Sequence, residues 1–253
     1  MGKLIRKATG LTVGVATLLA GLVLPMTASA ESASPIDASP IIHYSFDNAL
    51  TSKTIANEGS AANSDATLSG DATVANGQIS LTGSQTISVP TTAIAGKKDV
   101  TVSIWLKNNY GNGNTAAAYI GAAKTGNYPA NGYWLLNPAN PSGYAKSVMT
   151  NATVADPDNS PWGTEVGPGS TNAATTGTKA TSDLALYTTV ISGTNSTMSF
   201  YLNGKQVGDA TYTIPAGGLT NYGDLVAYIG KSSYADPNSK LDVDDYAVYD
   251  TAI

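Results

Sequence analysis

From Ile41 onward, hydrophobic and polar residues alternate in short runs that are typical of β-strands. In residues 100–106, Val, Val, Ile and Leu occupy every second position, and Thr, Ser and Trp lie between them. The same period of two recurs at residues 198–202. Such alternation places the apolar side chains on one face of a strand. Further strands are predicted at residues 116–120, 133–136, 145–150, 184–190, 225–229 and 243–249.

Asn-Gly pairs mark tight turns beside these runs. Asn203-Gly204 follows one alternating run, and Asn76-Gly77 precedes another. Both central residues of the favoured two-residue hairpin turn need a positive φ, which Asn and Gly adopt readily. After residue 30, no segment shows a 3.6-residue period over three or more turns. The sequence therefore predicts an all-β fold, a two-sheet antiparallel β-sandwich of the jelly-roll type.

The first thirty residues follow a different pattern. Three basic residues among the first seven precede an uncharged apolar run at residues 11–24, and Ala28-Ser29-Ala30 matches the small-x-small rule for cleavage. The run is short for a membrane span of about 20 residues. We expect a signal peptide at residues 1–30, cleaved near Ala30. This predicts a secreted or cell-surface bacterial protein with no membrane span in the mature chain.

Composition and charge exclude several classes of protein. Residues 31–253 carry ten Lys, no Arg and eighteen acidic residues, a formal net charge of −8, which is the wrong sign for binding nucleic acid. The chain has no Cys and one His, which excludes a disulfide scaffold and a multi-His metal cage. Residues 31–40 are rich in Ser, Ala and Pro and are predicted to be a linker. Residues 41–253 are predicted to form one domain.

Four segments occur in a set order along this domain. They are IHYSFD at residues 42–47, VTVSIWLK at residues 100–107, MSFYLNGK at residues 198–205, and YIG at residues 228–230 followed by DDYAVY at residues 244–249. In this order they resemble the laminin-G-like, concanavalin A-like lectin and glucanase jelly roll of secreted bacterial glycoside hydrolases. The resemblance implies two packed antiparallel sheets, one of them concave. It says less about function, because one fold hosts many functions.

The resemblance implies a carbohydrate-binding or accessory module of a secreted bacterial polysaccharide-degrading protein, with a polysaccharide or oligosaccharide as its ligand. Glycoside hydrolysis normally uses two carboxylates roughly 5 Å or 6.5–9.5 Å apart. This chain has only Glu31, Glu58 and Glu165, and none lies in the Glu-x-Asp-x-x-Glu strand of some enzymes with this fold. We therefore expect no catalysis by this chain alone. Two alternatives stay open: the N-terminal part of an arabinan- or xylan-active glycoside hydrolase with its catalytic module beyond Ile253, and a cell-surface adhesion domain.

Aromatic residues in the loop-rich middle of the chain are the candidate carbohydrate site. Flat Trp and Tyr rings cover the apolar faces of sugars, while amides bond their hydroxyls. Trp162 lies in a predicted loop. Tyr133 and Trp134 are successive residues of a predicted strand, so they face opposite ways and one of them belongs to the core. We predict that the ligand-binding residues are among Trp162, Tyr133 and Trp134.

Acidic residues near both ends of the domain indicate a calcium site. Asp47 ends the first predicted strand, and Asp244 and Asp245 open the last. The first and last strands of a jelly roll are often neighbours, and related domains often hold a structural Ca²⁺ in this area. Ca²⁺ takes six to eight oxygen ligands. We expect Ca²⁺ at Asp47 and at Asp244 or Asp245, with Asn57 as a further ligand. Solvated carboxylates at turns and strand ends are the alternative.

Overall fold

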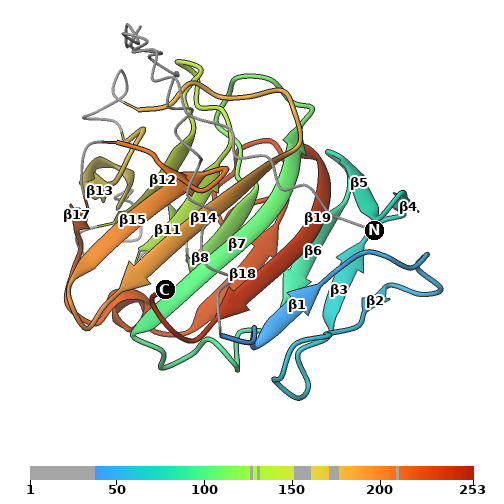
Figure 1. Cartoon of the computed structure of the whole chain (residues 1–253), viewed down its shortest axis with the longest axis horizontal. Coiled ribbons are helices and arrows are strands. Elements are labelled where there is room, and N and C mark those ends of the chain that lie inside the picture. Colours follow the sequence, from blue (N-terminus) through green and yellow to red (C-terminus); the bar gives the residue numbers. More distant parts are fainter. Residues whose placement is uncertain (1–37, 126–127, 130–131, 151–160, 171–176, 209–210) are drawn as a thin grey trace, which may run out of the picture. The chain divides into compact units, whose positions relative to one another are not determined.

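The computed structural model describes residues 38–125, 128–129, 132–150, 161–170, 177–208 and 211–253. The predicted signal peptide and most of the predicted linker lie outside these residues. The described strands form two main antiparallel sheets (Figure 1). Within the described ranges, no helix is long and apolar enough to cross a membrane. The prediction of an all-β two-sheet sandwich is therefore confirmed.

One sheet, called sheet A, contains the first and last strands of the domain. Its strands are β1 (Ile42–Tyr44), β4 (Thr73–Ala75), β5 (Gln78–Thr82), β7 (Asp99–Asn108), β14 (Ala185–Ser192), β15 (Thr197–Leu202), β16 (Lys205–Gln206), β17 (Tyr212–Thr213) and β19 (Lys240–Tyr249). Their order is β16-β15-β14-β7-β19-β5-β4, with β1 also paired to β19 and β17 to β15. Most of the long alternating runs in the sequence belong to this sheet.

The other sheet, called sheet B, carries the middle of the chain. Its strands are β2 (Thr54–Ile55), β3 (Ala66–Ser69), β6 (Thr86–Val89), β8 (Ala118–Ala122), β11 (Tyr133–Asn137), β12 (Lys146–Thr150), β13 (Glu165–Val166) and β18 (Leu225–Ile229). Their order is β13-β12-β11-β8-β18-β6-β3-β2. A separate hairpin joins β9 (Lys124–Thr125) to β10 (Tyr128–Pro129), and two short 3-10 helices are η1 (Pro161–Thr164) and η3 (Gly218–Tyr222).

Period-two alternation builds the core between the sheets. On β7, the alternate residues Val100, Val102, Ile104 and Leu106 are buried, whereas Trp105 is 36% exposed on the opposite face. On β11, Trp134 and Leu136 join the same core. Tyr133 and Leu135 belong to a second buried cluster with Tyr119 and Val148. Sheet B therefore carries an apolar, tyrosine-containing layer on the face that points away from sheet A.

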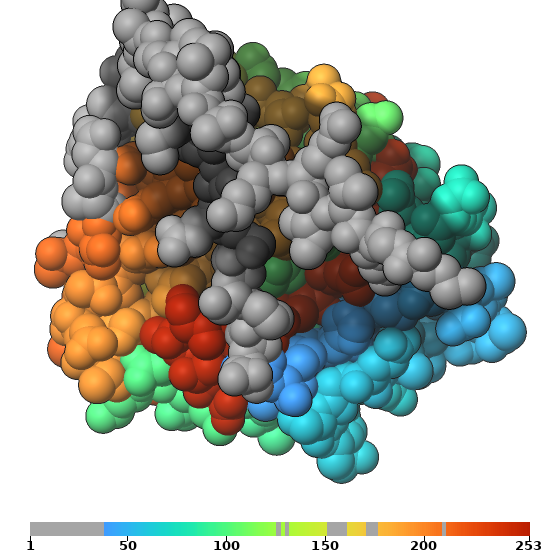
Figure 2. Space-filling model, viewed as in Figure 1, coloured from blue at the N-terminus to red at the C-terminus, as the bar shows by residue number. Residues whose placement is uncertain are grey.

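The first and last strands pair, as the family pattern predicts. Strand β1 is antiparallel to β19, with Ile42 opposite Val248. In Figure 2 the blue residues of the first strand lie beside red residues near the C-terminus. Strand β19 also pairs with β7 and has a bulge between Asp244 and Ala247, where Asp245 has a φ of 40°. Both ends of the domain therefore meet in sheet A.

The predicted Asn-Gly turns are also confirmed. Asn76 and Gly77 have φ values of 55° and 75°, and they join β4 to β5. Asn203 and Gly204 have φ values of 50° and 75°, and they join β15 to β16. Side chains other than Asn and Asp rarely adopt this left-handed backbone, so the two pairs set the register of their hairpins.

Candidate functional site

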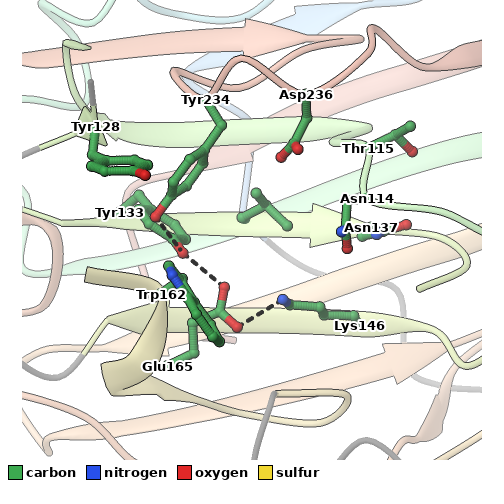
Figure 3. A pocket seen from close by; sticks show the side chains of 11 residues that line it. Asn114, Thr115, Tyr128, Tyr133, Asn137, Lys146, Trp162, Glu165, Tyr234 and Asp236 are labelled. Carbon is green, nitrogen blue, oxygen red and sulfur yellow. Dashed lines mark hydrogen bonds and ion pairs between the residues drawn. The ribbon is translucent and has the colours of Figure 1, made fainter. Parts of the chain in front are cut away.

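A cavity of about 340 Å³ opens on the outer face of sheet B. A volume of this size is in the range of small-ligand sites. Strands β10 to β13, the 3-10 helix η1 and two loops supply its lining (Figure 3): Asn114, Thr115, Tyr128, Tyr133, Leu135, Asn137, Lys146, Trp162, Glu165, Tyr234 and Asp236.

Strand β11 supplies the floor of the cavity. Its alternate residues Tyr133, Leu135 and Asn137 project to the outer face, because successive side chains of a strand point to opposite sides. Lys146 of β12 lies directly across from Asn137. Tyr133 lies across from Gly121 of β8, and a Cβ added at Gly121 would lie 2.4 Å from the Cβ of Tyr133. Only glycine at position 121 lets the two strands approach this closely.

The wall of the cavity is aromatic. The Tyr234 ring meets the Tyr133 ring edge-on, with centroids 5.5 Å apart and planes at 89°. The Tyr128 and Tyr234 ring centroids are 6.0 Å apart. Tyr119, on the neighbouring strand β8, stacks on Tyr133 with ring centroids 5.6 Å apart. Trp162, on η1, is 50% exposed and faces the same space (Figure 3). Trp162 therefore offers an exposed ring face to a ligand, whereas Tyr133 is only 1% exposed and packs within the wall.

A chain of polar contacts runs behind these rings. Tyr234 donates its hydroxyl to the Tyr133 oxygen at 3.2 Å, and Tyr133 donates to Glu165 Oε1 at 2.7 Å. Glu165 Oε2 lies 2.7 Å from Lys146 Nζ (Figure 3). Burial, and then the negative charge of Glu165, raise the pKa of Tyr133 well above its ordinary value. Tyr133 is therefore a neutral donor that holds the Glu165 carboxylate in place.

Asp236 adds a second carboxylate to the cavity. It lies in the loop between β18 and β19, and its carboxylate points toward the cavity in Figure 3. Partial burial of the carboxyl raises its pKa, and the positive charge of Lys146 opposes this rise. The cavity thus holds two acidic side chains and one basic one, at different depths.

The structure separates the three aromatic residues predicted to bind ligand. Trp162 and Tyr133 both line the cavity. Trp134 is fully buried in the core between the sheets, where its indole N–H donates to Ser147 Oγ at 3.0 Å. The alternation rule required one of the adjacent pair to be core, and that residue is Trp134. Trp134 therefore lies away from the cavity.

The lining residues that sequence reasoning missed include all three charged ones, Lys146, Glu165 and Asp236, and also Tyr234. Two of them carried a usable signal. Lys146 and Glu165 are isolated charges beside apolar strand residues, and a buried charge needs a partner. Tyr234 and Asp236 lie in a loop more than 60 residues further on, and nothing in their local sequence links them to the other two.

The acidic residues predicted to bind calcium lie around the β4–β5 turn. A Cβ added at Gly77 would lie 3.5 Å from Asp47 Oδ1 and 4.0 Å from Asp244 Oδ2. Burial, and then the charges of Asp245 and Asp47, raise the pKa of Asp244. Asp245 Oδ1 is turned to His43 Nε2 at 2.9 Å. Asp47 and Asp244 therefore offer hard oxygen donors to one place.

Ca²⁺ would need further oxygen ligands at this place. In the described part of the chain, no group of three or more His, Cys, Asp or Glu side chains is arranged to hold a metal ion. A Ca²⁺ ion held here would take two ligands from Asp47 and Asp244 and the others from backbone carbonyls or water.

Asn57 has a structural role instead. Its Oδ1 accepts hydrogen bonds from the backbone N–H of His43 at 2.8 Å and of Gly59 at 3.1 Å. Its Nδ2 donates to the carbonyls of Ile41 and Ala61. An amide oxygen has two lone pairs, and both are engaged here. Asn57 fastens the loop after β2 to β1, and the structure leaves no lone pair for a cation.

The model of the family described as the concanavalin A-like lectin/glucanases superfamily matches residues 81–253. The chain belongs to this superfamily. The match confirms the resemblance stated from the sequence motifs. No relative was found among curated proteins.

Solved structures of this superfamily fold resemble the chain at low sequence identity. Domain 4 of AbnA, an extracellular GH43 arabinanase from Geobacillus stearothermophilus in complex with arabinotriose, has a TM-score of 0.57 at 19% identity, over 85% of this chain and 94% of that one. The botulinum neurotoxin serotype D ligand-binding domain in complex with N-acetylneuraminic acid has a TM-score of 0.53 at 14% identity, over 85% of this chain and 48% of that one.

A sialidase from Trypanosoma rangeli has a TM-score of 0.52 at 12% identity, over 85% of this chain and 31% of that one. The chain thus spans about half of the neurotoxin domain and a third of the sialidase. Identities this low establish the fold alone, so the function of the chain has to be argued from its own cavity.

Proposed function

We propose that the chain is a carbohydrate-binding, non-catalytic accessory module of a secreted polysaccharide-degrading protein, and that its glycan binds in the cavity on sheet B. The observation that carries the proposal is the half-exposed Trp162 ring, which lines a cavity of about 340 Å³ together with Tyr133 and Tyr234. Aromatic faces of this kind cover the C–H faces of sugars. The similar fold of an arabinanase domain in complex with arabinotriose supports the proposal.

The proposal assigns no catalysis to the two carboxylates of the cavity. A glycosidase needs one carboxyl to protonate the leaving oxygen and another to attack or to activate water. Both oxygens of Glu165 are already engaged, by the Tyr133 hydroxyl and by Lys146. Reducing-sugar release by the purified protein that disappears in Glu165→Gln or Asp236→Asn would overturn the non-catalytic part of the proposal.

Trp162→Ala tests the binding proposal. We expect the parent protein to bind arabinan, xylan or galactan oligosaccharides, and Trp162→Ala to bind at least tenfold more weakly, because stacking on the exposed ring is lost. Trp105→Ala is the matched control, since Trp105 is 36% exposed on the outer face of sheet A. Isothermal titration calorimetry measures both.

Two outcomes would count against the binding proposal. Equal weakening in the two tryptophan variants would mean that the cavity is not the site. No binding of any oligosaccharide by the parent protein would favour the adhesion-domain alternative.

The second proposal concerns the carboxylates near the β4–β5 turn. We propose that a structural Ca²⁺ bridges Asp47 and Asp244 at the β4–β5 turn. Their convergence beside Gly77 supports it, and so does the charge repulsion that contributes to the raised pKa of Asp244. A divalent cation would remove that repulsion.

Secretion is also proposed on the sequence pattern, because residues 1–30 lie outside the described residues. We propose export and cleavage near Ala30, with a catalytic module as a further partner. Mass spectrometry of the exported protein tests this directly: a mature N-terminus at Glu31 is expected, and an intact residue 1 in the exported protein would contradict it.

A further inference from the structure

The charges of the cavity are not equally available to a ligand. Among the described residues, three charged side chains line it: Lys146, Glu165 and Asp236. Lys146 Nζ lies 2.7 Å from Glu165 Oε2, and their side chains are only 15% and 2% exposed. The two charges of this pair neutralise each other within the wall. The charge that faces the open space is the carboxylate of Asp236 (Figure 3).

Three polar side chains of the wall direct hydrogen-bond donors into the protein. Tyr133 donates its hydroxyl to Glu165, and Tyr234 donates to Tyr133. Asn137 donates its side-chain amide to the carbonyl of Gly113 at 2.8 Å. A bound anion needs donors or a cation, and each of these three groups directs one N–H or O–H bond into the protein.

We propose that the cavity selects neutral sugars and rejects acidic ones, such as uronic or sialic acids, and that Asp236 is the residue that decides this. The inference rests on the proposed glycan binding and names its ligand class. Asp236 accepts hydrogen bonds from sugar hydroxyls, which are strong when the acceptor is charged. It repels a carboxylate brought into the same space, because two like charges within a few ångström raise each other's energy.

Lys146 does not compensate for this repulsion. To neutralise an incoming carboxylate, its ammonium would have to leave Glu165, whose side chain is 2% exposed. Breaking one half of a buried ion pair leaves an uncompensated charge and is strongly unfavourable. The buried pair thus fixes Lys146 as part of the wall, and among the described lining residues Asp236 sets the sign of the charge that the ligand meets.

A panel of matched neutral and acidic oligosaccharides tests the inference. The neutral probes are arabino-, xylo- and galacto-oligosaccharides and lactose; the acidic probes are oligogalacturonides, glucuronoxylo-oligosaccharides and sialyllactose. By calorimetry at pH 7 and low salt, we expect the neutral members to bind at least tenfold more tightly than the acidic ones. The ratio of the affinity for neutral probes to that for acidic probes should fall several-fold in Asp236→Asn. It should stay unchanged in the control Asp183→Asn, because Asp183 is exposed and does not line the cavity.

Salt provides a second measurement on the unmodified protein, should Asp236→Asn fold poorly. Raising the ionic strength should reduce the ratio of neutral-probe to acidic-probe affinity, because salt screens the repulsion between Asp236 and an acidic sugar. Equal or tighter binding of the acidic probes would overturn the inference and leave glycan binding standing. An affinity ratio that neither salt nor Asp236→Asn changes would overturn it too. Binding of no probe at all would overturn the proposed function itself.

Discussion

At position 133, one tyrosine hydroxyl joins groups from three distant parts of the chain. It accepts from Tyr234 and donates to Glu165, which in turn pairs with Lys146. Its ring also forms the floor of the cavity. The neighbouring Trp134 takes no part, because its side chain points to the core. A difference of one position in the strand therefore separates a site residue from a core residue.

Tyr133→Phe keeps the ring and removes only this hydroxyl. Glu165 Oε1 then loses a donor in a buried place, and an unsatisfied buried acceptor costs about 1–3 kcal/mol. We expect the free energy of unfolding to fall by that amount in urea denaturation. Tyr201→Phe, on a half-buried residue of β15, is the control and should change it by less than about 0.5 kcal/mol. An equal fall in the free energy of unfolding in both variants would show that the Tyr133 hydroxyl does not stabilise Glu165.

At the scale of elements, the cavity depends on how closely β8 and β11 approach. Gly121 lies opposite Tyr133 in this pair, and the space where its Cβ would lie is taken by the Tyr133 backbone and Cβ. Register and residue size act together here: any side chain at position 121 would push β11, and the aromatic floor with it, out of place.

Gly121→Ala tests this close approach. An added Cβ 2.4 Å from the Cβ of Tyr133 forces the strands apart, and overpacking of this kind typically costs about 1–3 kcal/mol. We expect a lower melting temperature and weaker oligosaccharide binding. Gly163→Ala is the control, because no heavy atom of the described structure lies within 4 Å of its Cβ position. A Gly121→Ala variant as stable as Gly163→Ala would mean that the sheet absorbs the added methyl group.

At the scale of the whole molecule, the two ends of the domain meet at the proposed calcium site. Asp47 follows β1, Asp244 lies in β19, and Gly77 belongs to the turn between β4 and β5. An ion held by these carboxylates would tie together segments about 200 residues apart in the sequence. A ligand that binds only the folded state stabilises it by about 2.7 kcal/mol at a hundredfold excess over Kd.

Removal of calcium should therefore lower the melting temperature. For a domain of this size we expect a chelator to lower it by roughly 5–10 °C in differential scanning calorimetry. Asp47→Ala should lose this response, and Asp183→Asn should keep it. In chelator, the raised pKa of Asp244 means that its ionisation disfavours the folded state. The contribution of Asp244 to stability is therefore lost as the pH rises through that pKa, and Asp244→Asn should remove this loss. A chelator without effect on a calcium-loaded sample would contradict the proposal.

The sequence by itself determined the fold class and the positions of most long strands. Strand β18 was predicted at its observed bounds, and β7, β11, β12, β14, β15 and β19 within a few residues. The Asn-Gly turns and the pairing of the first and last strands followed from local conformational limits and from the family motifs. These features are readable because alternation and positive φ are properties of neighbouring residues.

The tertiary structure alone decided the site. Alternation shows that Tyr133 and Trp134 face opposite ways, but it does not show which face is covered by the other sheet. Only the packing of sheet A against sheet B made Trp134 core and left Tyr133 in a cavity. Lys146, Glu165 and Asp236 meet there because strand register and a long loop bring them together. Such contacts join residues up to 90 positions apart, so no local pattern in the sequence records them.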